Sequence, residues 1–167
     1  MPDRHFVDAD LYVNHLSSNL SVVSDPFIAS RHVGFVAVSA VTVYEIAMKQ
    51  IFIEFGVKKH AVLGNFTRAR FDRINGRIAY KTIWDEHIRM FGDKYVVRFK
   101  KKMKVTEDDA LVTRGKSVVT SYGNIVTWRN TFAHEGLVPQ NVTLSEVVSS
   151  YQEGKHVIRC LASSMVR

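Results

Sequence analysis

The chain lacks the residues that several large classes of protein depend on. Cys160 is its only cysteine among 167 residues, so no disulfide can form within the chain and no thiolate cluster can hold zinc. The seven histidines show no zinc spacing, and no glycine-rich loop of the phosphate-binding or dinucleotide-binding type is present. We therefore expect neither a metal ion nor a cofactor.

Long apolar runs and a secretory leader are also missing. The most apolar stretch, residues 33–55, is interrupted by Glu45, Lys49, Gln50 and Glu54, which argues against a membrane span. The N-terminus is polar and charged, unlike a secretory signal. Together with the absence of a disulfide framework, these features predict a cytoplasmic protein without a membrane partner.

Positive charge is concentrated in the middle of the chain. The formal net charge is +7, but residues 58–104 hold fourteen Lys and Arg against four Asp and Glu, a net +10. The remainder holds nine against twelve, a net −3. Such asymmetry favours a polyanionic partner, of which nucleic acid is the commonest. A solvated face that serves only solubility is the alternative.

The pattern of apolar residues predicts helices in a single domain over residues 1–167. The expected helices cover residues 5–23, 30–55, 79–91, 116–134 and 143–164. β-branched residues are common in 30–55, but its length and the following Gly56 favour a buried helix over a strand. Thr143-Leu144-Ser145-Glu146 is a capping-box signature that opens the last helix. The expected fold is all-α: an antiparallel helical bundle with an insert between the long helices.

Residues 57–78 are less regular. Gly64-Asn65 and Asn75-Gly76 indicate turns. Three arginines between and beside these turns have the i, i+3, i+7 spacing of one helical face. They are Arg70, Arg73 and Arg77.

Residues 93–115 contain a basic run that fits a strand or a helix, and we favour a helix. Thr106, which three acidic residues follow, has the pattern of a helix N-cap. The lysines of the run are candidates to hold an RNA backbone by counterion release, with little sequence information. They are Lys100, Lys101, Lys102 and Lys104, and Arg70, Arg73 and Arg77 would extend this patch.

The most informative stretch is residues 128–136, Trp-Arg-Asn-Thr-Phe-Ala-His-Glu-Gly. It places Arg129 and His134 five positions apart near the end of a helical pattern. Arginine can stabilise phosphate charge and histidine can move a proton near neutral pH, which is enough chemistry to cleave RNA without a metal. Five residues correspond to about 140° around an ideal helix. The two side chains can therefore converge only if the helix ends there or if two chains build the site.

Two charged residues lie on apolar helical stripes. Arg129 continues the spacing of the apolar residues on its own helix, and Glu45 is the only acidic or basic residue between Val33 and Met48. An unpaired buried charge is strongly unfavourable. We therefore expect Glu45 and Arg129 to face each other or a shared polar cleft. A plain buried ion pair that joins two helices is the alternative.

These residues resemble a known family. Residues 129–136 look like the Arg-x(4–6)-His motif of HEPN domains in its common Arg-Asn…Ala-His form. Glu45 resembles the acidic residue that many of these proteins carry on an earlier long helix. The helix order and the insert between the long helices are most similar to the branch called RiboL-PSP-HEPN.

The resemblance implies a metal-independent endoribonuclease of a toxin–antitoxin or phage-defence system, which leaves 2′,3′-cyclic phosphate and 5′-hydroxyl ends. Arg129 would stabilise the charge of the scissile phosphate, and His134 would act as general acid or base. Asn130 would orient the site or contact phosphate, and Glu45 would position Arg129. It further implies a homodimer whose active site lies at the two-fold interface, with RNA and an antitoxin or neighbouring defence protein as partners.

Two other functions stay open on the sequence alone. Some HEPN domains are catalytically silent and bind a partner protein, a nucleotide or a nucleic acid. A basic helical nucleic-acid-binding protein without chemistry would depend on Lys100 to Lys104 instead of Arg129 and His134. Gly136 stands where some toxin-type members carry a tyrosine that a partner enzyme modifies, so control by that route is not supported.

Overall fold

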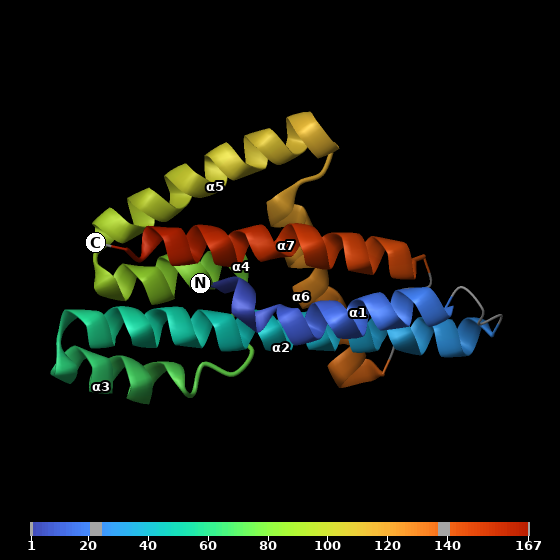
Figure 1. Ribbon diagram of the computed structural model, residues 1–167, viewed down its shortest axis with the longest axis horizontal. Coiled ribbons are helices and arrows are strands. Elements are labelled where there is room, and N and C mark those ends of the chain that lie inside the picture. Colours follow the sequence, from blue (N-terminus) through green and yellow to red (C-terminus); the bar gives the residue numbers. More distant parts are fainter. Residues whose placement is uncertain (1, 21–24, 137–140, 167) are drawn as a thin grey trace.

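The computed structural model is an all-α bundle in which two long helices, α2 and α7, lie side by side (Figure 1). It describes residues 2–20, 25–136 and 141–166. No strand occurs in these ranges, so the predicted fold class is confirmed. In chain order the elements are the 3₁₀ turn η1 (Pro2–His5), α1 (Val7–Leu20), α2 (Pro26–Lys59), α3 (Ala61–Phe71), α4 (Tyr80–Thr82), the π-helical segment η2 (Ile83–Ile88), the 3₁₀ turn η3 (Arg89–Phe91), α5 (Asp93–Arg114), α6 (Val118–Glu135) and α7 (Leu144–Ser164).

The longest helix, α2, organises the bundle. The Asp25 carboxylate caps it by accepting the Phe27 N–H at 2.8 Å, so the Asp25-Pro26 pair opens this helix. The helix then contacts α1, α3, α6 and α7. By length and composition alone, Phe27–Lys59 would be able to cross a membrane, but 44% of its most apolar window is buried inside the bundle. Residues of α2 such as Tyr44 and Met48 belong to the hydrophobic core.

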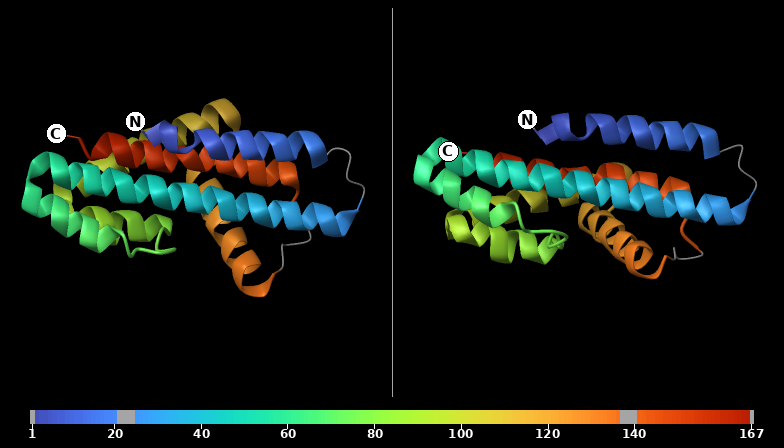
Figure 2. Two further views of the ribbon diagram at one scale, coloured as in Figure 1. Left: turned by 60° about the horizontal axis from the view of Figure 1, so that its bottom comes forward. Right: turned by 90° about the horizontal axis from the view of Figure 1, so that it is seen from below.

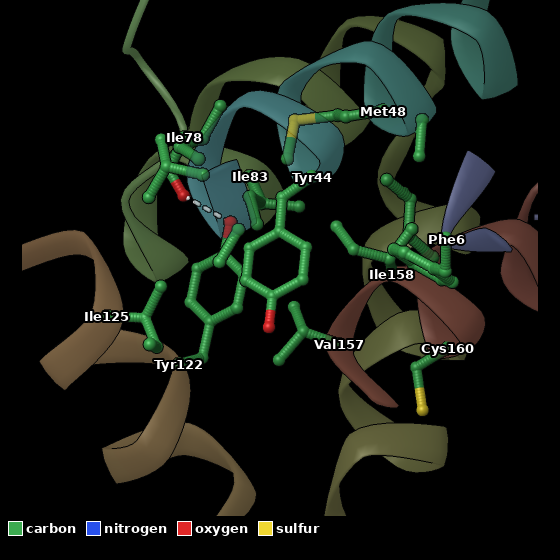
Figure 3. Packing of buried hydrophobic residues seen from close by; sticks show 14 of the residues in the cluster. Phe6, Tyr44, Met48, Ile78, Ile83, Tyr122, Ile125, Val157, Ile158 and Cys160 are labelled. Atoms are coloured by element: carbon green, nitrogen blue, oxygen red, sulfur yellow. Dashed lines mark hydrogen bonds between the residues drawn. The ribbon is translucent and has the colours of Figure 1, made fainter. Parts of the chain in front are cut away.

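The core is built where α2, α6 and α7 meet, around three fully buried tyrosines, Tyr44, Tyr122 and Tyr151. The Tyr44 ring is stacked on the other two, with ring centroids 5.2 and 5.9 Å apart. Buried hydroxyls need partners. Tyr44 donates to the Tyr151 carbonyl at 2.6 Å. Tyr122 donates to the Ile78 carbonyl at 2.7 Å (Figure 3). A β-carbon at Gly154 would lie 2.4 Å from the Tyr44 hydroxyl, so glycine is needed there.

The segment after α2 differs from the prediction. Gly64-Asn65 does not form a turn but lies inside α3. Gly64 is buried there, and a β-carbon on it would lie 2.9 Å from Val57 Cγ2 on α2. The glycine thus allows α3 to pack closely on α2, and this tertiary contact outweighs its local preference for a turn. The turn at Asn75-Gly76 is confirmed.

The expected shared face of three arginines is wrong because α3 ends at Phe71. Arg70 lies in the last turn of α3, whereas Arg73 and Arg77 lie beyond it. All three side chains are exposed. Arg77 forms an ion pair with Glu86 on η2, so its charge is already partly compensated.

Residues 93–114 form one continuous helix, which confirms the preference for a helix over a strand. The N-cap expected at Thr106 is wrong, because Thr106 lies in the middle of α5. Its hydroxyl lies 3.3 Å from the sulfur of Cys160, which is buried in the core. The turn at Gly115, where φ is 64°, separates α5 from α6.

The remaining predicted helices are confirmed, with shifted ends. The first helix runs over Val7–Leu20, and its expected continuation to residue 23 lies outside the described residues. The segment 79–91 is helical but passes from α-helix through a π-helical stretch into a 3₁₀ turn. The capping box is present in full: the Thr143 hydroxyl accepts the Glu146 N–H at 3.2 Å, and the Glu146 carboxylate accepts the Thr143 N–H at 2.8 Å.

Candidate functional site

Arg129 and His134 both lie in the last two turns of α6. The helix is regular through Glu135, and Gly136 caps it with a φ of 67° while its N–H donates to the Phe132 carbonyl at 3.0 Å. No break separates the two residues, so their side chains leave the helix about 140° apart. Arg129 is half-buried and His134 is exposed. One chain alone therefore does not bring the two onto one face.

The Arg129 guanidinium packs on the turn that follows α3. This turn extends towards α6 on the same side of α2 (Figure 2). A β-carbon at Gly76 would lie 3.2 Å from Nη2 and 3.4 Å from Nη1 of Arg129. Gly76 has a φ of 74°, a conformation that favours glycine. Nη1 also donates to the Asn130 side chain at 2.8 Å.

The positive charge of Arg129 is not paired directly. Within the part of the chain that the structure describes, no carboxylate lies within ion-pair distance of its guanidinium. The guanidinium lies beside Gly76 and makes one hydrogen bond to Asn130, which leaves further N–H donors for a ligand. Such an arginine is suited to bind an anion.

Glu45 reaches the same turn from α2. Its Oε2 accepts the Gly76 N–H at 2.8 Å, and its Oε1 forms an ion pair with Lys49 at 2.9 Å. Burial raises the pKa of Glu45, but the hydrogen bonds from Lys49 and Gly76 and the charges of Lys49 and Arg129 outweigh it and hold the pKa below its usual value. Glu45 and Arg129 thus meet at Gly76 and not in a direct ion pair.

Three side chains from three elements hold the backbone of residues 76–78. Glu45 of α2 accepts the Gly76 N–H, as described above. His87 of η2 places Nε2 2.8 Å from the Arg77 carbonyl, and Tyr122 of α6 donates to the Ile78 carbonyl at 2.7 Å. Hydrogen bonds from three different elements therefore hold consecutive backbone groups of the turn on which the Arg129 guanidinium packs.

His87 is fully buried beside the rings of Phe52 and Phe71. Burial lowers its pKa, which favours a neutral imidazole whose Nε2–H donates to the Arg77 carbonyl. Its Nδ1 has no hydrogen-bond partner among the described residues. Nothing in the local sequence pattern around His87 indicates which carbonyl it reaches.

The end of α6 that carries His134 is fixed to the first turns of α2. A β-carbon at Gly34 would lie 2.2 Å from the Phe132 ring. The ring therefore packs in space that any larger side chain at residue 34 would fill. Arg31 donates to the Gly136 carbonyl at 2.9 Å and thereby ties down the helix cap. The sequence reasoning missed Arg31 and Gly34, which stand near the start of an apolar helix without a motif around them.

The predicted basic run is divided between two sides of α5. Lys100 and Lys104, one turn apart, line a pocket that also contains Trp84, whereas Lys101 and Lys102 line a different groove. The four side chains are exposed. In Figure 1, α5 lies along the edge of the molecule opposite to the C-terminal end of α6. The run therefore does not form one patch beside His134.

Comparison with known proteins supplies the family. A family model described as RiboL-PSP-HEPN matches residues 6–167, nearly the whole chain. The protein belongs to this HEPN family. No curated protein and no solved structure matches the chain. The match is compatible with a nuclease or another RNA-related function of this HEPN domain. Within its described residues, no group of three or more His, Cys, Asp or Glu side chains is placed to hold a metal ion.

Proposed function

We propose that this HEPN protein is a metal-independent endoribonuclease in which Arg129 and His134 carry the chemistry. The observation that supports this most is the state of Arg129. Its guanidinium lies beside Gly76 and donates to Asn130, yet no carboxylate within the described part of the chain neutralises it. An arginine whose charge is unpaired and whose N–H donors remain available is suited to bind a phosphodiester.

In the proposed reaction the ribose 2′-oxygen attacks the adjacent phosphorus and the 5′-oxygen leaves, which gives a 2′,3′-cyclic phosphate and a 5′-hydroxyl. Arg129 would stabilise the extra negative charge on the pentacoordinate phosphorus. His134 would take the proton from the 2′-hydroxyl or give one to the leaving oxygen. Asn130 would orient the guanidinium through its hydrogen bond to Nη1, and Glu45 would position it through Gly76.

The angular separation on α6 favours a site built from two chains. If His134 of one protomer serves Arg129 of another, a two-fold axis generates two equal sites. Large apolar side chains lie exposed beside the end of α6: Phe27 is 64% exposed and Phe35 49%. Phe35 also contacts Phe132 edge-on. An exposed apolar patch next to the site is a suitable surface for a second copy.

A ribonuclease of this kind would act in the cytoplasm as a toxin or a defence effector. An antitoxin or a neighbouring defence protein would then keep it inactive until it is needed. Expression of the protein in growing cells tests this role: we expect growth arrest with the wild type and none with His134→Ala. Arrest by both proteins would mean that toxicity does not come from cleavage.

The deciding experiment is RNA cleavage in EDTA by the wild type, Arg129→Ala and His134→Ala. We expect products with cyclic phosphate ends that persist in chelator, and a fall of at least about 100-fold in each variant. Cleavage that requires added magnesium would contradict the mechanism. A folded wild type that cleaves no RNA of a broad panel would favour the silent binding module.

Mixing the two inactive variants tests whether the site is shared. If each site takes its arginine and histidine from different protomers, mixed dimers regain one intact site. Random exchange then restores about a quarter of the wild-type activity, since half of the dimers are mixed and each has one of two sites intact. Phe35→Glu should separate the dimer and abolish activity. Val112→Glu on α5, where the side chain is 85% exposed, is the matched control.

A further inference from the structure

A pocket of about 340 Å³ lies between η2, α5 and the start of α6. Its lining combines two aromatic residues, Tyr80 and Trp84, with two lysines, Lys100 and Lys104. Met103, Glu107 and Val119 complete it. This pocket is separate from the Gly76 turn and from the residues that hold Arg129. Its combination of aromatic faces and flexible cations is that of sites for single-stranded nucleic acid.

Trp84 is covered on one face by a side chain that can leave. The Lys100 ammonium lies 3.5 Å from the centroid of the Trp84 ring. A cation over an exposed ring contributes about 0.5–1 kcal/mol, whereas a nucleobase stacked on an aromatic side chain contributes about 1–3 kcal/mol. A base can therefore displace Lys100, whose long flexible stem lets its charge move to a neighbouring phosphate.

The one carboxylate in the pocket is already engaged. Glu107 Oε2 accepts the Val119 N–H at 3.0 Å, in the first turn of α6. The partial positive charge of that helix N-terminus offsets the carboxylate. Lys100 and Lys104 lie one turn apart on α5, so both ammonium groups border the same opening. The balance of charge in the pocket therefore favours an anionic ligand.

The pocket and Arg129 lie along the same helix. Val119 lines the pocket, and Arg129 follows ten residues later, about 15 Å along the axis of α6 and about 80° around it. An extended RNA strand that follows this helix would span the two places with a few nucleotides. The residues between Gly76 and Tyr80 connect them along the chain as well.

We infer that Trp84 stacks a nucleobase of single-stranded RNA while Lys100 and Lys104 hold the adjoining phosphates. This subsite would place the strand so that a phosphodiester reaches Arg129, and to that extent it rests on the proposed ribonuclease function. It accounts for two lysines of the basic run and leaves Lys101 and Lys102, on the other side of α5, outside the contact. Trp84 thus becomes a binding residue that selects unpaired RNA.

The fluorescence of Trp84 can report RNA bound in the pocket, because the chain has only one other tryptophan, Trp128. In a Trp128→Phe, His134→Ala protein, oligoadenylate RNA stays uncleaved, and with excitation selective for tryptophan the emission comes from Trp84 alone. We expect strong quenching on titration with the single strand, and none with duplex RNA, whose bases are already stacked. The Trp84→Phe, His134→Ala protein retains Trp128 alone and should show no comparable quenching.

Substitutions separate stacking from simple burial. Trp84→Leu keeps apolar volume without a ring, and we expect it to weaken binding of the oligonucleotide about tenfold. Trp84→Phe should restore most of that loss. Lys100→Ala should weaken binding more than Lys101→Ala, its neighbour on the other side of α5. Circular dichroism of each variant confirms that the fold is retained.

The outcomes distinguish this inference from the proposed function. Quenching and a Trp84-dependent affinity without any cleavage by the wild type would support the RNA subsite and contradict the proposed ribonuclease function. Cleavage with an unchanged affinity and KM in Trp84→Leu would leave the ribonuclease standing and overturn the subsite. Equal losses in Lys100→Ala and Lys101→Ala, without quenching, would also overturn it, because a diffuse charge effect would then explain the binding.

Discussion

Glu45 and Arg129 act on the same glycine from two helices. The Glu45 carboxylate accepts the Gly76 N–H at 2.8 Å, and the Arg129 Nη2 would lie 3.2 Å from a β-carbon on that residue. The two charged groups therefore approach the same backbone residue without direct contact with each other. Arg129 is positioned in this way without losing its charge to a carboxylate, which is what an anion-binding arginine needs.

Gly76→Ala tests this coupling. A β-carbon at a φ of 74° is strained and also presses on the guanidinium, so we expect a loss of about 1–2 kcal/mol in the free energy of unfolding and at least a tenfold loss of cleavage. Gly115→Ala is the matched control, since its φ is 64° and nothing lies within 4 Å. It should cost similar stability and leave cleavage intact. Equal activity in the two variants would show that Gly76 does not position Arg129.

Gly34→Ala tests how the end of α6 is held. The new methyl group would meet the Phe132 ring at 2.2 Å, and we expect destabilisation of about 1–3 kcal/mol with a displaced His134 and reduced cleavage. In a Phe132→Ala background the same change should be neutral or stabilising, because helical Ala is favoured over Gly by about 1 kcal/mol. Urea denaturation of the four proteins gives the coupling energy. Gly123→Ala, with open space around it, should stabilise the protein.

His87→Gln tests the dependence of stability on acid. Because burial lowers the pKa of folded His87, the unfolded chain takes up a proton first as the pH falls below about 6.5. Stability is thus fully present above that pH and is lost as the pH falls towards the folded pKa. Glutamine can still donate to the Arg77 carbonyl but does not titrate near this pH.

Urea denaturation of wild type and His87→Gln at a series of pH values from neutral to mildly acidic measures the difference. We expect a smaller loss of stability in the variant. Some acid dependence will remain, since burial also lowers the pKa of His5 and His156. Identical pH profiles for the two proteins would mean that His87 is solvated or protonated in the fold.

The helices that the sequence predicted are those whose signals are local. The capping box at Thr143 and the cap at Gly136 act within one turn, so the pattern of neighbouring residues contains them. The thirty-four residues of α2 are apolar around much of the helix because four other helices contact it. Its length made a strand implausible. All-α architecture follows from such patterns.

The errors arose where tertiary contact outweighs local preference. Gly64 favours a turn locally, but in the bundle its lack of a side chain lets α3 approach α2. The same limit applies to the site. Arg129 and Glu45 were predicted as site residues because charges on apolar helical stripes need partners. No sequence pattern shows that the two meet at Gly76 or that His87 binds the carbonyl of the next residue. Those contacts depend on how the turn after α3 is placed.

The three stacked tyrosines set a limit on the tolerance of the protein to alkali. Burial raises the pKa of Tyr44, Tyr122 and Tyr151, half of the six tyrosines in the chain. An unfolded chain releases these phenolic protons at about pH 10, whereas the folded core retains them. Stability therefore falls as the pH rises beyond that value, and the phenolate absorbance of these residues should appear only together with loss of helix. Strong base would therefore unfold the bundle as a unit, because its central tyrosines ionise only when the core opens.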